Sequence, residues 1–116
     1  MTLCDDVLNL DERIRFVAQL DQNENLIEMK HKTGVKSLTK EKTDQEFFSF
    51  IQPIVLGACS KLEKDMGCIK TVRVKYQKAS IVFLRIHGAI LGISMDPGPT
   101  TPVVNKIGQK YGVDLT

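Results

Sequence analysis

Apolar and polar residues alternate along two neighbouring stretches in the first third of the chain. Residues 14–20 (IRFVAQL) place an apolar side chain at every second position, which is typical of a strand. Residues 26–32 (LIEMKHK) repeat this alternation less regularly. Between them, residues 21–25 form an Asp- and Asn-rich stretch that is typical of a turn. The pattern therefore predicts a β-hairpin.

The strongest helical periodicity lies in the middle of the chain. The sequence Thr43-Asp44-Gln45-Glu46 fits a capping box at the start of a helix, and Gly67 can end that helix. Pro53 lies inside it and removes a backbone hydrogen bond, so we expect the helix to kink there or to split near Gln52. Apolar residues recur at three- and four-residue steps, at Phe47, Phe50, Ile51, Ile54, Ala58 and Leu62.

Shorter helical patterns lie towards the two ends of the chain. Leu3, Val7 and Leu10 have helical spacing and predict a short amphipathic helix within residues 3–13. In the last helix, Thr101 is expected to be the cap, Pro102 the first position and Gly112 the end. The apolar face of this last helix comprises Val103, Val104, Ile107 and Tyr111.

After Cys68 the period changes to two, which indicates strands over residues 69–76, 80–87 and 89–95. The last two are apolar on both faces, as central strands are. The element order α-β-β-α-β-β-β-α indicates an α+β fold with a five-stranded antiparallel sheet between helical layers. With the first strand beside the fifth, the strand order is 2-1-5-4-3. The strand over residues 69–76 then lies at an edge, and the central helix and the terminal helices cover opposite faces.

The apolar surface of the central helix is wider than one sheet requires. A second apolar row, made of Phe48, Val55 and Cys59, lies beside the first. Together the rows cover roughly half of the circumference at about 100° per residue, whereas packing on a sheet needs an arc of about 100°. The remainder is expected to meet another element or another chain.

The composition is that of a globular chain. The 116 residues are 42% hydrophobic and carry a formal net charge of +2, which excludes intrinsic disorder. No apolar run approaches the ~20 residues of a membrane helix, and the acidic N-terminus does not fit a signal peptide. We therefore expect one cytoplasmic domain over residues 1–116. The small net charge conceals a balance of −5 in residues 1–28 and +7 in residues 29–116.

The sequence contains no recognisable catalytic, cofactor or metal motif. Glycine-rich phosphate loops and a nucleophile elbow are absent. The three cysteines are too far apart for a zinc site, and their odd number argues against a disulfide framework. Cys59 and Cys68 are expected to be buried, and Cys4 is the candidate for an exposed thiol. We therefore expect a non-enzymatic protein without cofactor or metal.

A basic set near the second strand is a candidate partner-binding patch. It has no interleaved aromatic residues and contains Lys rather than Arg, so a protein partner is favoured over nucleic acid. The set comprises Lys30, Lys32, Lys36, Lys40 and Lys42.

The element order, the pattern IRFVAQLDQNENLIEM and the ending SIVFLRIHGAILGISMDPGPTTPVVNKI resemble the roadblock/dynein light chain family, a profilin-like and longin-related group. The resemblance covers nearly the whole chain. It implies a homodimer in which the edge strands pair and the central helices pack across the dyad. The interface would then include Phe48, Val55, Cys59, Ile69, Thr71, Val72, Arg73 and Val74. If the chain is instead a monomer, Arg73, Lys75 and Lys78 are charges that protect the edge.

The resemblance implies an adaptor or a regulator of a small GTPase. One alternative is a PAS- or GAF-like sensor of a small molecule, which needs a cavity of roughly a few hundred Å³ between sheet and central helix. Large side chains at Phe47, Phe50, Ile54 and Phe83 favour a filled core instead. A nucleic-acid-binding protein is the other alternative.

Overall fold

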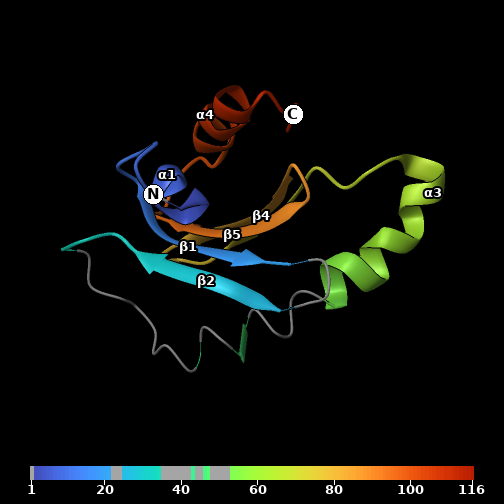
Figure 1. The fold of residues 1–116 in the computed structure, drawn as a ribbon, viewed down its shortest axis with the longest axis horizontal. Coiled ribbons are helices and arrows are strands. Elements are labelled where there is room, and N and C mark those ends of the chain that lie inside the picture. The colour runs from blue at the N-terminus through green and yellow to red at the C-terminus, as the bar shows by residue number, and fades with distance from the viewer. Residues whose placement is uncertain (1, 22–24, 35–42, 44–45, 48–52) are drawn as a thin grey trace.

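A five-stranded antiparallel sheet forms the centre of the structure (Figure 1). The computed structural model describes residues 2–21, 25–34, 43, 46–47 and 53–116. The strand order β2-β1-β5-β4-β3 confirms the prediction. The elements are α1 (Leu3–Leu8), β1 (Ile14–Leu20), β2 (Leu26–His31), η1 (Pro53–Ala58), η2 (Cys59–Leu62), α3 (Glu63–Met66), β3 (Thr71–Lys75), β4 (Ser80–Ile86), β5 (Ala89–Met95) and α4 (Thr101–Tyr111).

The three central strands are apolar on both sides because both of their faces are covered. In each of β1, β4 and β5, five of the seven residues are buried. Helices α1 and α4 lie on the same side of the sheet and cover what we call the α1/α4 face (Figure 1). The opposite side, the second face, has its own buried cluster of Phe16, Ala18, Leu20, Phe83 and Ile90.

Helix α1 is shorter than predicted but has a well-formed start. The Thr2 hydroxyl accepts a hydrogen bond from the Asp5 amide, and the Asp5 carboxylate accepts one from the Thr2 amide. The prediction of an exposed Cys4 is wrong, since this side chain is fully buried. Cys4, Val7 and Leu8 share one face of α1 by helical spacing, and that face packs on the sheet.

Helix α4 begins one residue before its predicted first position. Thr100, not Thr101, is its N-cap residue, and Pro102 lies within the first turn. The Thr100 side chain does not cap the helix; it accepts a hydrogen bond from Arg73 instead. Gly112 ends the helix in the left-handed conformation with φ +66°, as predicted.

The predicted central helix is helical over residues 53–66, but as three successive helix types. Pro53 begins the π-helix η1, which continues into the 3₁₀-helix η2 and then the single turn α3. Most of the predicted start, including Asp44, Gln45 and Gln52, lies outside the described residues. Phe47 is described, and its ring lies 6.0 Å from that of Phe83 on the second face.

Residues 53–66 stand beside one end of the sheet and extend away from it, and we call them the protruding helix (Figure 1). The prediction that Ile54 fills the core is wrong, because its side chain is 54% exposed. The prediction of buried cysteines also fails here, since Cys59 is half-buried and Cys68 exposed. Ile54 and Cys59 are accessible because this helix does not pack on the sheet along its whole length, and Cys68 lies beyond the helix in the connection to β3.

No helix among the described residues is long and apolar enough to cross a membrane.

Candidate functional site

The β3 strand is one edge of the sheet and pairs only with β4 among the described strands. The Tyr76 amide donates to the Ala79 carbonyl at 2.8 Å within the β3–β4 hairpin. Since inward and outward groups alternate along an antiparallel ladder, the backbone groups of Thr71, Arg73 and Lys75 point away from β4. The strand therefore presents a short row of hydrogen-bonding groups to another chain.

The side chains of β3 divide between the two faces of the sheet. Val72 packs against the cluster on the second face. Arg73 points to the α1/α4 face, where its Nη1 donates to the hydroxyls of Thr100 and Thr101, each at 2.9 Å. Arg73 therefore joins the edge strand to the start of α4. A strand fixed in this way is a rigid edge for pairing.

The protruding helix exposes large apolar side chains beside this edge. Ile54, Leu62 and Met66 are 54%, 57% and 77% exposed. These are not the residues of the predicted second row: Ile54 and Leu62 belong to the row expected on the sheet, and Met66 to neither row. Met66 and Leu62 lie one helical turn apart, so they extend along one side of the helix.

The remaining predicted interface residues are only partly placed. Ile69 is half-buried and joins the protruding helix to β3, and Thr71 and Val74 are half-buried in β3. Phe48 lies outside the described residues, and the structure does not describe the side chain of Val55. Residues 67–70 connect the protruding helix to the edge strand β3, and the predicted interface remains a prediction.

Glu63 fixes the protruding helix to the sheet. Its carboxylate accepts hydrogen bonds from both terminal nitrogens of Arg85 on β4, each at 3.4 Å, and from the Ile69 amide at 3.3 Å. Neither residue belongs to the predicted site, and no local spacing links two residues 22 positions apart. The pair sets where the helix leaves the sheet and hence where its apolar side chains lie.

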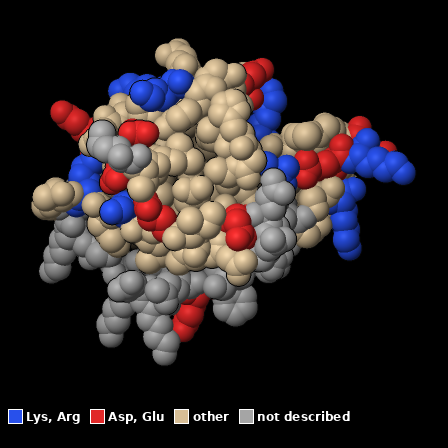
Figure 2. All heavy atoms as spheres, in the orientation of Figure 1, with Lys and Arg blue, Asp and Glu red and all other residues tan. Residues whose placement is uncertain are grey.

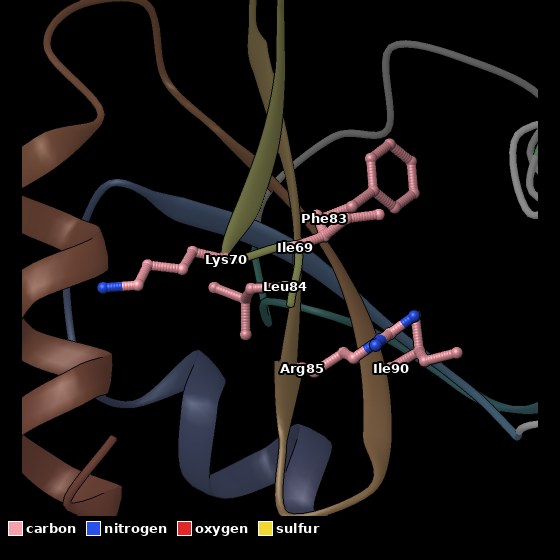
Figure 3. Close-up of a pocket in the computed structure, with 6 residues that line it drawn as sticks. All are labelled: Ile69, Lys70, Phe83, Leu84, Arg85 and Ile90. Atoms are coloured by element: carbon pink, nitrogen blue, oxygen red, sulfur yellow. The ribbon is translucent and has the colours of Figure 1, made fainter. Parts of the chain in front are cut away.

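A hollow beside Arg85 is too small for a metabolite. Its lining is shown in Figure 3 and consists of Ile69, Lys70, Phe83, Leu84, Arg85 and Ile90. Its volume of about 10 Å³ matches the room needed for a single water molecule. A drug-sized ligand needs roughly 300 Å³ or more. This hollow offers no support for a sensor of small molecules.

The predicted basic patch is only partly described, because Lys36, Lys40 and Lys42 lie outside the described residues. Lys30 is exposed. Lys32 is half-buried, and its ammonium donates to the Asp11 carbonyl at 2.7 Å, so its charge helps to hold the fold. On the face shown in Figure 2, Lys and Arg lie in separate groups among Asp and Glu rather than in one continuous patch.

The titratable groups do not form a reactive centre in the described part of the chain. No group of three or more His, Cys, Asp or Glu residues suited to a metal is found there. Burial is the main reason that the pKa of Cys4 is raised to about 12, with the Glu28 carboxylate adding to the effect. A hydrogen bond from Lys106 holds the pKa of Asp11 below its ordinary value. His87, at the β4–β5 turn, contacts the Tyr111 carbonyl through Nε2 at 2.9 Å.

Three solved structures share this arrangement. The roadblock/LC7 domain from Streptomyces avermitilis has a TM-score of 0.68 at 6% identity, over 95% of this chain and 89% of its own. MglB from Myxococcus xanthus has a TM-score of 0.68 at 18% identity, and the match covers 94% of this chain and 85% of that protein. An MglB with a tetrameric arrangement has a TM-score of 0.68 at 12% identity, and the match covers 93% of this chain and 78% of that protein. This chain has a roadblock-type fold.

The likeness to solved structures is found by comparing folds, not by comparing sequences. No protein-family model matches the sequence, and no curated protein sequence matches it. At the identities given above, the likeness concerns the fold. Because the order of elements is shared with these structures although few residues are identical, the order of elements was enough to predict the architecture.

Proposed function

We propose that residues 1–116 form one roadblock-like domain that dimerises and acts as a non-enzymatic adaptor or regulator of a small GTPase in the cytoplasm. The observation that carries the proposal is the exposed apolar side of the protruding helix, which residues 67–70 connect to β3, an edge that pairs only with β4 among the described strands. Leu62 and Met66 expose apolar surface to water, which does not stabilise a monomer. The roadblock-type fold and the tetrameric arrangement of one MglB support self-association.

In the proposed dimer, the β3 edges pair and the protruding helices cover each other's apolar side. The outward amides of Thr71, Arg73 and Lys75 would bond to the second copy, and the helix would bury Leu62 and Met66. Such a pairing removes the unpaired edge and the exposed apolar surface at once. The predicted interface residues Phe48, Val55, Cys59, Ile69, Val72 and Val74 belong to the same proposal.

Light scattering after gel filtration at micromolar concentration tests this proposal. We expect a dimer for the parent chain and a monomer for Lys75→Pro, which removes one outward amide and no bond to β4. Lys75→Ala is the matched control, because it loses the same side chain but keeps the amide. Leu62→Glu should also give a monomer, whereas Gln109→Glu on the exposed side of α4 should not.

A monomeric parent chain at all concentrations would overturn the dimer. The regulatory role has its own test. A small GTPase encoded in the same genome should bind the parent chain, or the GTPase should hydrolyse GTP at a different rate when the parent chain is present. If the dimer forms and neither effect is seen with any such GTPase, the adaptor role is retained and the regulatory role is rejected.

A further inference from the structure

At the opposite edge of the sheet, β2 pairs only with β1 among the described strands, and its outward backbone groups have no partner strand there. The Lys32 amide donates to the Arg15 carbonyl of β1 at 2.9 Å, and Lys30 lies opposite Val17. Because inward and outward groups alternate, the amide and carbonyl groups of Met29 and His31 point away from β1. The register shifts after Gln19, so that no β1 residue lies opposite Ile27. This bulge limits the regular free edge to residues 28–32.

The two faces of the β2 edge carry different chemistry. On the α1/α4 face, Glu28 is held by a hydrogen bond of 2.6 Å from the Thr2 hydroxyl, and the exposed Lys30 is two residues further on. On the second face, Met29 packs against the buried cluster. The His31 ring lies 4.6 Å from that of Phe16 on the same face. The edge thus has opposite charges on one face and apolar groups on the other.

We propose that the β2 edge pairs antiparallel with the β2 edge of a second copy of this chain, with the dyad at Met29. The outward groups of the two Met29 residues then exchange two hydrogen bonds. Glu28 of each copy lies opposite Lys30 of the other, at a pair of positions where no backbone bonds form and side chains are closest. Two Glu–Lys contacts result in one interface.

The charges select this register over its neighbours. Moving the dyad to Glu28 places two carboxylates opposite each other, and moving it to Lys30 places two ammonium groups opposite each other. Like charges directly opposite on a sheet are unfavourable. Any register between these positions would set outward groups against inward ones and lose the hydrogen bonds. Only the dyad at Met29 satisfies the backbone and pairs both charges.

This interface is separate from the proposed β3 dimer and does not depend on it. The regular edge is only five residues long, so the contact is small and the association is expected to be weak. Where both interfaces form, copies of the chain assemble beyond a dimer. Where the β3 edge does not pair, as in Lys75→Pro, the β2 edge alone gives a dimer only at concentrations above the micromolar range in which that variant is expected to be a monomer.

Charge exchange between two variants tests the pairing. Glu28→Lys and Lys30→Glu each set like charges opposite each other in a self-pair and should weaken the β2 association about tenfold. A mixture of the two should restore it, because the lysines of one copy then face the glutamates of the other. The double variant E28K/K30E should restore it also. Sedimentation velocity over a concentration series measures each sample.

Mixing the two variants distinguishes a loss of pairing from a loss of folding, because a variant that is only destabilised is not rescued by a second variant in solution. Circular dichroism melts check that each variant is folded, because Glu28→Lys also loses the bond from Thr2. Lys110→Glu on α4 is the control for a change of net charge. Failure of the mixture and the double variant to associate more strongly than the single variants overturns the proposal, as does a parent chain without β2-dependent association.

Discussion

The Glu63 carboxylate accepts one hydrogen bond from each terminal nitrogen of the Arg85 guanidinium, at 3.4 Å in both cases. This two-point contact joins the protruding helix to the end of β4. Both side chains are partly exposed, so water screens the pair and its contribution to the free energy of unfolding is about 1 kcal/mol or less. Its main effect is on the position of the helix.

Glu63→Ala is therefore expected to release the protruding helix with little loss of global stability. Lys61 and Lys64 in the released segment should become faster sites of cleavage by trypsin, because a protease needs a locally opened chain. Limited proteolysis followed by mass spectrometry measures this. Asp65→Ala, at an exposed neighbouring position, should leave the cleavage rate unchanged; equal acceleration in both variants would contradict the anchoring role.

The contact between Arg73 and Thr100 makes a second prediction. The Thr100 side chain is almost fully buried and its hydroxyl accepts the Arg73 bond at 2.9 Å. Thr100→Val keeps the shape but removes the acceptor, so we expect a loss of about 1 kcal/mol in the free energy of unfolding. Thr101→Val, at the exposed acceptor, should cost less. Urea denaturation of both variants measures the difference, and equal costs would argue against the buried bond.

Gly108 makes a third prediction, because the space around it is closed. A Cβ built at this position would lie 2.7 Å from the Val113 carbonyl oxygen, a backbone atom that cannot move aside easily. We expect Gly108→Ala to destabilise the protein by about 1–3 kcal/mol, despite the better helix propensity of Ala. Thermal and urea denaturation measure the change.

Gly57 is the matched control, since it is also helical and a Cβ there would meet nothing within 4 Å. Gly57→Ala should be neutral or stabilising by up to about 1 kcal/mol. A similar loss for both variants would mean that the contact with Val113 does not determine the effect.

The cysteines make a fourth prediction, which concerns pH. Burial raises the pKa of Cys4 from 9.0 to about 12. Between these values the unfolded chain loses the thiol proton and the folded chain keeps it, so the free energy of unfolding falls as pH rises through this range. Cys4→Ala should remove this part of the pH dependence, although the smaller side chain lowers the stability at neutral pH.

Thiol labelling at neutral pH checks the same assignment. Cys68 is exposed and should react fast with a thiol reagent, Cys59 more slowly, and Cys4 only after unfolding. Mass spectrometry after a short labelling pulse distinguishes the three sites. Fast labelling of Cys4 in the folded protein would contradict its burial.

The sheet could be predicted from the sequence because each strand carries its own signal. The bounds of β1 and β5 were predictable to the residue, since residues 14–20 and 89–95 have a clear pattern and flanking turns. The hairpin and the meander follow from their short connections, whereas the order β2-β1-β5-β4-β3 also required the condition that β1 lies beside β5, which the structure confirms. An apolar excess on the central helix was predictable, but the location of the exposed apolar side chains relative to the sheet was not. That location depends on Glu63 and Arg85, whose contact has no signature in local sequence.

Boundaries set by competing hydrogen bonds were not predictable either. Thr100 and Thr101 are both good cap residues, and both of their hydroxyls accept a hydrogen bond from Arg73 of the distant strand β3 instead, a contact that local sequence does not indicate. Pro53 indicated a disturbance in the central helix, and the described part of this helix begins at that residue as a π-helix. A proline marks where regular hydrogen bonding fails, but the helix type that follows depends on tertiary contacts.

The helices are attached to the sheet to different degrees, which affects how fast their amide hydrogens exchange with solvent. Helices α1 and α4 are buried against the sheet, whereas the protruding helix is held mainly through Glu63 among its described contacts. Amide hydrogens of residues 53–66 should therefore exchange in openings that leave the sheet intact. A binding protein that reshapes this segment would meet only the small free energy of that local opening, and the sheet would stay a fixed platform throughout.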